Sequence, residues 1–180
     1  MKAIGVAVGL AVGLLSLYGP VPSGAGAADP GPPKPAELKV LDRLVGSWQE
    51  ESISKPAEWT PKEERTKATI TTEWVLGGWF VQVKERSDDN QEAIHMITYD
   101  VERKAYRRWR FNSTGGAGEA TGKWDEDSKT FTWTRTLEKD ITLVSRWKLV
   151  DKDTMEETAI AKDKNGKVYL DVTGKTTRRK

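Results

Sequence analysis

The sequence contains no cysteine and only one histidine, His95, among its 180 residues. Without cysteine the chain can form no disulfide and can carry no lipid-modified cysteine, so its stability must come from packing. Zinc and copper sites usually combine several His, Cys or acidic ligands at defined spacing. The sequence therefore predicts no metal site and no cofactor, and we interpret His95 as a core or pocket-lining residue.

A large charge excess is also missing, because 29 basic residues balance 27 acidic ones and the net charge is +2. This balance gives no general attraction to nucleic acid or to a membrane surface. The stretch 106–111 alternates arginines with aromatic residues, but on a strand it is more simply a solvated basic face. We therefore expect no nucleic-acid partner and no stable membrane insertion.

No recognisable catalytic motif is present. The sequence has no Gly-x-Ser-x-Gly elbow, no phosphate-binding loop, no cysteine nucleophile and no histidine pair. Carboxylates are plentiful, but acid-base catalysis needs two of them at a controlled distance in a cleft. No residue is assigned a catalytic role.

A hydrophobic run long enough to span a membrane is absent too. The apolar residues 3–18 follow Met1-Lys2 and precede Pro20 and Pro22, and the run is shorter than the roughly 20 residues that cross a bilayer. The triplet 25–27 (Ala-Gly-Ala) fits a signal-peptidase site. Residues 1–28 are predicted to be a signal peptide of an exported bacterial protein, periplasmic or extracellular.

Residues 29–36 are predicted to be an extended linker, because 29–35 contain four prolines. The folded domain is predicted to span residues 37–180. It begins with a short amphipathic helix over 36–44, in which Leu38, Leu41 and Leu44 recur at helical spacing and Gly46 follows as the stop.

From Trp48 onward the chain consists of short runs rich in Val, Ile, Thr and Trp, separated by turn residues at intervals of about ten positions. After a strand at Trp48, further strands are predicted at 67–75, 79–85, 93–99, 106–113, 120–124, 130–136, 141–150, 154–161 and 168–174. Sequential strands without crossover helices favour an up-and-down sheet that closes on itself. The predicted fold is mainly β, a lipocalin-like antiparallel barrel of about nine or ten strands with a short N-terminal helix.

Four short motifs carry a family resemblance: Leu41-x-x-Leu44-Val45-Gly46-Ser47-Trp48, Val75-Leu76-Gly77-Gly78, Tyr99-Asp100 and Gly122-Lys123-Trp124-Asp125. With the preceding helix and the strand succession, they resemble the lipocalin and calycin superfamily. They are more closely similar to a bacterial family of secreted domains of unknown function with lipocalin-like barrels. The resemblance implies a barrel able to hold a small molecule, with no established reaction.

The resemblance also implies a structural motif of Gly46, Trp48 and Arg178, in which the late arginine covers the tryptophan ring as a cation over an aromatic face. Haem is not expected. Haem-binding relatives continue the Gly-x-Trp triplet with more glycines and place their axial histidine late. Here residues 49–51 are Gln-Glu-Glu, and His95 lies mid-chain.

Isolated polar residues on otherwise apolar strand faces give the candidate ligand-binding residues. Together with neighbouring aromatic residues they are Trp74, Gln82, His95, Tyr99, Arg107, Trp133, Arg135 and Glu157. Two guanidinium groups beside a tyrosine favour a carboxylate or another anionic head group. A register slip of one residue would exchange the two faces of any strand.

These residues lead to three hypotheses. The first is an exported barrel that binds a small, partly hydrophobic and anionic molecule. The second is a structural or protein-interaction module whose interior is filled by its own side chains. The third is a weak enzyme of unknown reaction, which rests only on the versatility of such folds.

Overall fold

The structure, a computed structural model, describes residues 33–137 and 140–180. The predicted signal peptide (1–28) and residues 29–32 of the predicted linker lie outside the described residues. Residues from Pro33 to Lys180 form one compact unit. Within the described ranges, no helix has both the length and the apolar character needed to cross a membrane.

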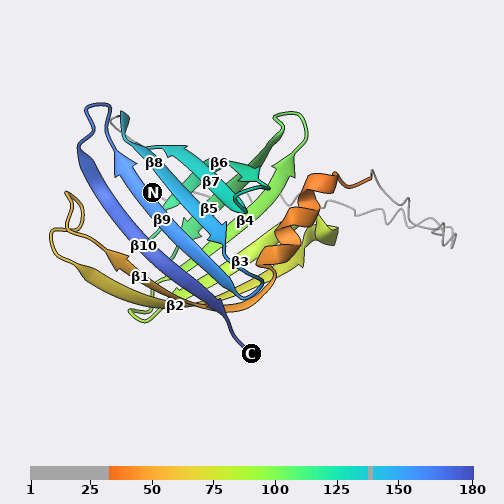
Figure 1. The fold of residues 1–180 in the computed structure, drawn as a ribbon, viewed down its shortest axis with the longest axis horizontal. Helices are drawn as coiled ribbons and strands as arrows, with labels where there is room; N and C mark the ends of the chain where they lie inside the picture. The colour runs from red at the N-terminus through yellow and green to blue at the C-terminus, as the bar shows by residue number, and fades with distance from the viewer. Residues whose placement is uncertain (1–32, 138–139) are drawn as a thin grey trace, which may run out of the picture. The chain divides into compact units, whose positions relative to one another are not determined.

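Ten antiparallel strands form a closed barrel, in which each strand pairs with the next along the chain and β1 pairs with β10 (Figure 1). The strands are β1 (Gly46–Ser54), β2 (Glu64–Val75), β3 (Phe80–Ser87), β4 (Glu92–Asp100), β5 (Ala105–Asn112), β6 (Ala117–Asp125), β7 (Thr130–Thr136), β8 (Thr142–Leu149), β9 (Thr154–Lys162) and β10 (Val168–Arg178). The predicted fold class is confirmed, with ten strands. Because the barrel is closed, each of these ten strands has a paired neighbour on both sides.

The 3-10 helix η1 (Ala36–Leu44) precedes the barrel (Figure 1). The predicted spacing of Leu38, Leu41 and Leu44 buries these three side chains in the barrel core. Tyr106 at the start of β5 donates a hydrogen bond to the Glu37 carbonyl at 2.8 Å. The helix therefore closes the end of the barrel at which β5 begins. A second 3-10 turn, η2 (Leu76–Gly78), joins β2 to β3.

The Gly-x-Trp triplet and the last strand meet at the same end. The Arg178 guanidinium lies 3.9 Å from the centre of the Trp48 ring, and its Nη1 donates to the Val45 carbonyl at 2.7 Å. Gly46 has φ 134°, and a Cβ there would collide with Arg178. This is the contact that the lipocalin resemblance implied for these three residues.

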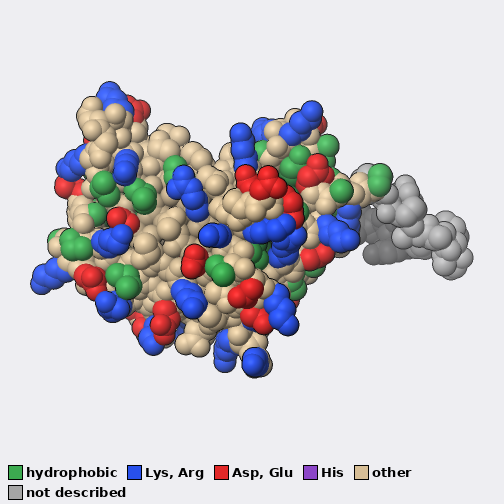
Figure 2. Space-filling model, viewed as in Figure 1, with side chains coloured by type: hydrophobic (Ala, Val, Ile, Leu, Met, Phe, Trp, Pro, Cys, Tyr) green, Lys and Arg blue, Asp and Glu red, His purple; other side chains and the backbone are tan. Residues whose placement is uncertain are grey.

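Alternating side chains divide the barrel into an interior and an outer face. In β2, for example, Ala68 and Thr72 are buried while Thr69, Thr71 and Glu73 are exposed, as expected for period-two strands. The part of the interior near η1 is apolar and aromatic, and includes Phe131 and Trp133 stacked at 5.5 Å. On the face of the barrel in view in Figure 2, basic and acidic side chains are interspersed.

Candidate functional site

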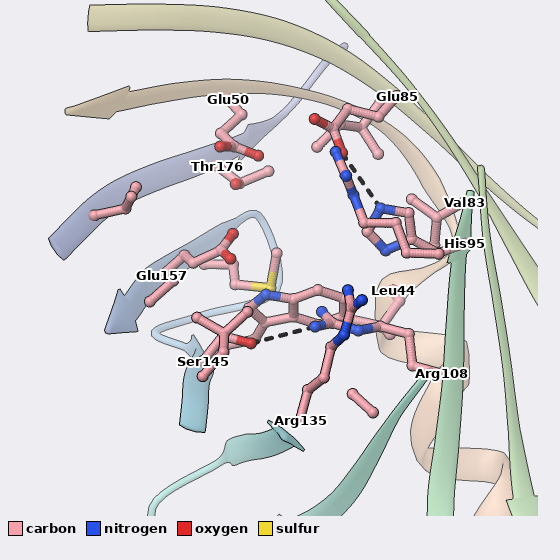
Figure 3. A pocket seen from close by; sticks show the side chains of 18 of the residues that line it. Leu44, Glu50, Val83, Glu85, His95, Arg108, Arg135, Ser145, Glu157 and Thr176 are labelled. Atoms are coloured by element: carbon pink, nitrogen blue, oxygen red, sulfur yellow. Dashed lines mark hydrogen bonds and ion pairs between the residues drawn. The ribbon is translucent and has the colours of Figure 1, made fainter. Parts of the chain in front are cut away.

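A cavity of about 330 Å³ lies inside the barrel, next to the aromatic layer that η1 covers. All ten strands contribute to its wall, which includes apolar side chains such as Ile70, Leu143 and Val172. Polar and charged side chains share the same wall (Figure 3). A cavity of this size lies at the lower end of the range for small-molecule sites.

Three arginines from β5 and β7 form one side of the cavity, here called the arginine side: Arg108, Arg110 and Arg135. The Arg108 guanidinium lies 4.9 Å from the centre of the Trp133 ring and 4.7 Å from that of Trp147, and it donates to Ser145 Oγ at 3.3 Å. Burial lowers the pKa of Arg108 to about 10, so it stays protonated at neutral pH.

Arg135 is placed by its neighbours on β6. Its guanidinium lies against Gly118, where any Cβ would collide with it, and its Nη2 donates to the Ala117 carbonyl at 3.1 Å. Gly122 makes room in the same way for the Trp133 ring. The small residues of β6 therefore allow the large side chains of β7 to lie flat along the inner wall.

His95 on β4 and Glu85 on β3 form a pair beside the arginines, with Nε2 3.4 Å from the carboxylate (Figure 3). Burial, and then the positive charge of Arg108, lower the pKa of His95 although Glu85 opposes the shift, so the imidazole is neutral at pH 7. Burial alone would raise the pKa of Glu85. The close contact with His95 and the positive charges of Arg110 and Arg108 outweigh burial, so the pKa of Glu85 is lowered and this carboxyl stays ionised.

The opposite side of the cavity, here called the glutamate side, consists of Glu50 on β1, Thr176 on β10 and Glu157 on β9. Gly174 lies between the two carboxyls: it pairs with Glu157 across the strands, and Glu50 Oε1 lies 3.6 Å from the place of its missing Cβ. Burial, together with the nearby charges of Glu157 and Glu85, raises the pKa of Glu50 to about 8. Burial also raises the pKa of Glu157.

These shifts give the cavity a positive charge. At neutral pH the guanidinium groups of the three arginines stay charged, while the raised pKa values move Glu50 and Glu157 towards the neutral acid. Glu85 is then the main carboxylate inside. Glu119 also borders the cavity, but its carboxylate pairs with Arg107. An anion entering the cavity would therefore meet an excess of positive charge.

Several buried polar atoms of the wall lack a hydrogen-bond partner among the described residues. They include Thr176 Oγ1, Trp147 Nε1 and His95 Nδ1, and these three side chains are at least nine-tenths buried. Unpaired buried polar groups cost free energy of folding unless water or a ligand satisfies them. In the described part of the chain, no cluster of three or more His, Cys, Asp or Glu could hold a metal ion.

The structure brings three of the sequence-predicted residues into the cavity wall, namely His95, Arg135 and Glu157. Trp133 lies directly beneath Arg108. Trp74 and Tyr99 lie nearer to η1: Trp74 donates to Asp42 Oδ1 at 2.8 Å, and Tyr99 packs against Tyr106. Both are thus part of the closed end and not of the cavity.

Two of the predicted residues, Gln82 and Arg107, lie on the outer face. Gln82 contacts Met96 Sδ, while the side chains that β3 turns inward are Val81, Val83 and Glu85. Arg107 forms ion pairs with Asp100 and Glu119. On β3 and β5 the face predicted to point into the barrel is the outer face. The prediction followed the aromatic residues Phe80 and Trp109, which pack against each other on the outside of the barrel.

Sequence reasoning missed five charged residues of the wall: Glu50, Glu85, Arg108, Arg110 and Glu119. Two signals could have identified some of them. Glu50 is two positions from the buried Trp48 and must share its face. The turn after β4 pairs Tyr99 with Tyr106, which places Arg108 opposite the buried Ile97.

Solved structures with the same fold include the S-type phycobiliprotein lyase CPES from Guillardia theta, with 16% sequence identity over 79% of this chain and 92% of that one and a TM-score of 0.53. They also include Rv2717c from M. tuberculosis, with 12% identity over 82% of this chain and all of the other (100%) and a TM-score of 0.62. No curated protein matches the chain. Residues 34–178 match the family described as protein of unknown function (DUF1579), so the chain belongs to this family, and a family of unknown function is what the four sequence motifs indicated.

Proposed function

We propose that this protein binds a small, partly hydrophobic anion inside its barrel. One observation carries the proposal: three arginines line a cavity in which Glu50 and Glu157 have raised pKa values. A carboxylate or similar group can form charge-assisted hydrogen bonds with the guanidinium groups, while Ile70, Leu143 and Val172 contact its apolar part. The fold shared with a phycobiliprotein lyase is compatible with a small-molecule site.

The size of the cavity limits the ligand. A cavity of about 330 Å³, at about 30 Å³ for each water-sized group, holds on the order of ten non-hydrogen atoms. Monocyclic aromatic acids and short fatty acids fit this limit. We therefore take para-ethylbenzoate and octanoate as test ligands, with para-ethylbenzamide as an uncharged match for the first.

Intrinsic tryptophan fluorescence measures binding directly, because Trp133 and Trp147 stack on Arg108 at the cavity. Titration with para-ethylbenzoate should change the emission saturably, and para-ethylbenzamide should bind at least about tenfold more weakly, since it forms no charge-assisted bond. The proposal fails if no acid in the panel binds, or if acid and amide bind equally.

A matched pair of variants locates the site. Arg110→Met removes one guanidinium from the cavity, and about tenfold to hundredfold of the affinity for para-ethylbenzoate should be lost, as expected for a hydrogen bond to a charged group. Arg146→Met removes an arginine that is exposed on the outer face of β8 and does not line the cavity, and it should leave the affinity within about twofold. Equal effects of the two variants would refute the assignment.

The other two hypotheses receive less support. A module with a filled interior is disfavoured by the cavity itself. A weak enzyme is favoured only by the His95–Glu85 pair, whose neutral imidazole could accept a proton. The carboxyls of Glu50 and Glu157 line the same cavity, but the three arginines give a direct reason for binding an anion, so binding is the function proposed.

Export to the periplasm or the medium belongs to the same proposal, and it rests on the signal-like order of residues 1–28. Expression of the full chain followed by N-terminal sequencing of the mature protein tests it. Cleavage after Ala27 or Ala28 outside the cytoplasm is expected. Retention of Met1 on a cytoplasmic product would contradict it.

A further inference from the structure

The two sides of the cavity differ in the groups that they offer to a ligand. The arginine side offers guanidinium donors from β5 and β7, and the glutamate side offers the oxygens of Glu50, Glu157 and Thr176 from β1, β9 and β10 (Figure 3). In the closed barrel β1, β10 and β9 are neighbours, and β5, which contributes Arg108 and Arg110, lies directly across the ring from β10. Opposite walls therefore favour groups of opposite character.

The glutamate side has the features of a built site. Gly174 on β10 lies beside both carboxyls, since it pairs with Glu157 on β9 and the place of its missing Cβ is 3.6 Å from Glu50 Oε1. Thr176 is 1% exposed, yet its hydroxyl has no hydrogen-bond partner in the part of the chain described. A simple anion bound to the arginines would bring no hydrogen-bond donor to these oxygen atoms, although carboxyl and hydroxyl oxygens can all accept hydrogen bonds.

We propose that the ligand is bifunctional, with an anionic group at the arginine side and an ammonium or other strong hydrogen-bond donor at the glutamate side. This inference rests on the proposed anion site and adds the second half of the ligand. The chemical class is that of the amino acids in the broad sense, with a carboxylate and an amine on one small apolar frame. An ammonium group has three donors, one for each acceptor side chain of the glutamate side.

The protonation of Glu50 supplies a readout that differs in sign between the two ligand classes. The groups that face its carboxyl are Glu157 on β9, Glu85 on β3, Arg110 on β5 and Ser52 on its own strand. An ammonium favours the ionised carboxylate and expels its proton, whereas an anion alone favours the protonated form. Since the pKa of Glu50 is about 8, up to about half a proton moves per ligand at pH 8 in either direction.

The test compares three ligands on the same ring. The probes are para-(aminomethyl)benzoate, which carries both groups; para-ethylbenzoate, its isostere with the anion alone; and para-(aminomethyl)benzamide, with the cation alone. Calorimetric titration at pH 8 in two buffers of different ionisation enthalpy gives affinity and proton count together. We expect the bifunctional probe to bind about tenfold or more tighter than para-ethylbenzoate and to release protons. We expect para-ethylbenzoate to take protons up.

Variants assign the effect to the glutamate side. Glu50→Gln and, as a second variant of nearly unchanged shape, Thr176→Val should each reduce the preference for the bifunctional probe over its isostere by about threefold or more. Glu51→Gln alters the next residue of β1, which is exposed on the outer face and pairs with Lys67 at 2.7 Å, and should keep the full preference.

The outcomes separate this inference from the proposed function. If para-ethylbenzoate binds and the bifunctional probe binds no tighter, the second half of the ligand is refuted and the anion site stands. If none of the three probes binds, the anion site itself is refuted. If the bifunctional probe binds tighter but Glu50→Gln and Thr176→Val both retain the preference, the donor lies elsewhere and the glutamate side is not its site.

Discussion

Replacing Glu50 by glutamine should stabilise the protein and flatten the dependence of its stability on pH. The pKa of this carboxyl rises from its usual 4.5 to about 8 in the folded state, chiefly through burial. Between these two values the folded protein holds a proton that the unfolded chain has released. The free energy of unfolding must therefore fall as pH rises through this window.

The size of this change in the free energy of unfolding follows from the shift in the pKa of Glu50. Each pH unit between 4.5 and about 8 lowers the free energy of unfolding by at most about 1.4 kcal/mol. At pH 7 the loss amounts to about 3 kcal/mol relative to pH 4.5. Glutamine has nearly the shape of the protonated acid and no proton to lose, so Glu50→Gln should recover most of this amount. A rise in Tm of about 6–12 °C at pH 7 corresponds to it.

Urea denaturation of wild type and variant at several pH values between 5 and 9 measures the effect. The gain from Glu50→Gln should be small at pH 5 and grow steadily towards pH 8. Glu51→Gln is the matched control: its carboxylate pairs with Lys67, and that pairing lowers the pKa of Glu51. Parallel pH profiles of wild type and Glu50→Gln, or a loss of stability at pH 8, would refute the reasoning.

Two further predictions concern the closed end of the barrel. Arg178→Met removes the cation over Trp48 and the hydrogen bond to the Val45 carbonyl, and it should lower the free energy of unfolding by about 2 kcal/mol. The control variant Arg179→Met should change this free energy by less than about 0.5 kcal/mol. Urea denaturation measures both, and equal effects would contradict the assigned contact. Leu41→Ala empties a side-chain site that is 0% exposed and should cost about 2–5 kcal/mol. Leu76→Ala, at a leucine that is 66% exposed, should cost less than about 0.5, and thermal unfolding of both variants would show whether η1 packs as described.

Local sequence signals were sufficient for the barrel. Leu38, Leu41 and Leu44 have the spacing of one helix face, and their burial follows from it. The alternation in residues 67–75 and the frequent turns identified strands and their succession. These features depend on period and on turn chemistry, both of which are local properties of the chain.

The interior face of β3 and β5 could not be found in the same way. In β5 the buried Tyr106 and the outer Trp109 have opposite parity, so aromatic residues alone do not identify the inner face. What decides the face is cross-strand pairing, here Tyr99 with Tyr106. This information is carried by the length of the turn and by the neighbouring strand. Reading each strand alone assigned Arg107 to the cavity in place of Arg108 and Arg110.

The two ends of the barrel interior differ in how their buried side chains are packed and paired, and this difference indicates that the glutamate side is a binding site. The apolar layer of Phe131 and Trp133 together with η1 closes one end of the barrel and gives it a core. The glutamate side adds no comparable packing, and it carries a carboxyl with a raised pKa and the unpaired hydroxyl of Thr176. Such groups lower stability when nothing occupies the cavity. A ligand that donates hydrogen bonds to Glu50 and Thr176 would offset that cost in the bound state. Of two ligands that bind the arginine side equally well, the one that also donates to the glutamate side should therefore raise the Tm of the protein more.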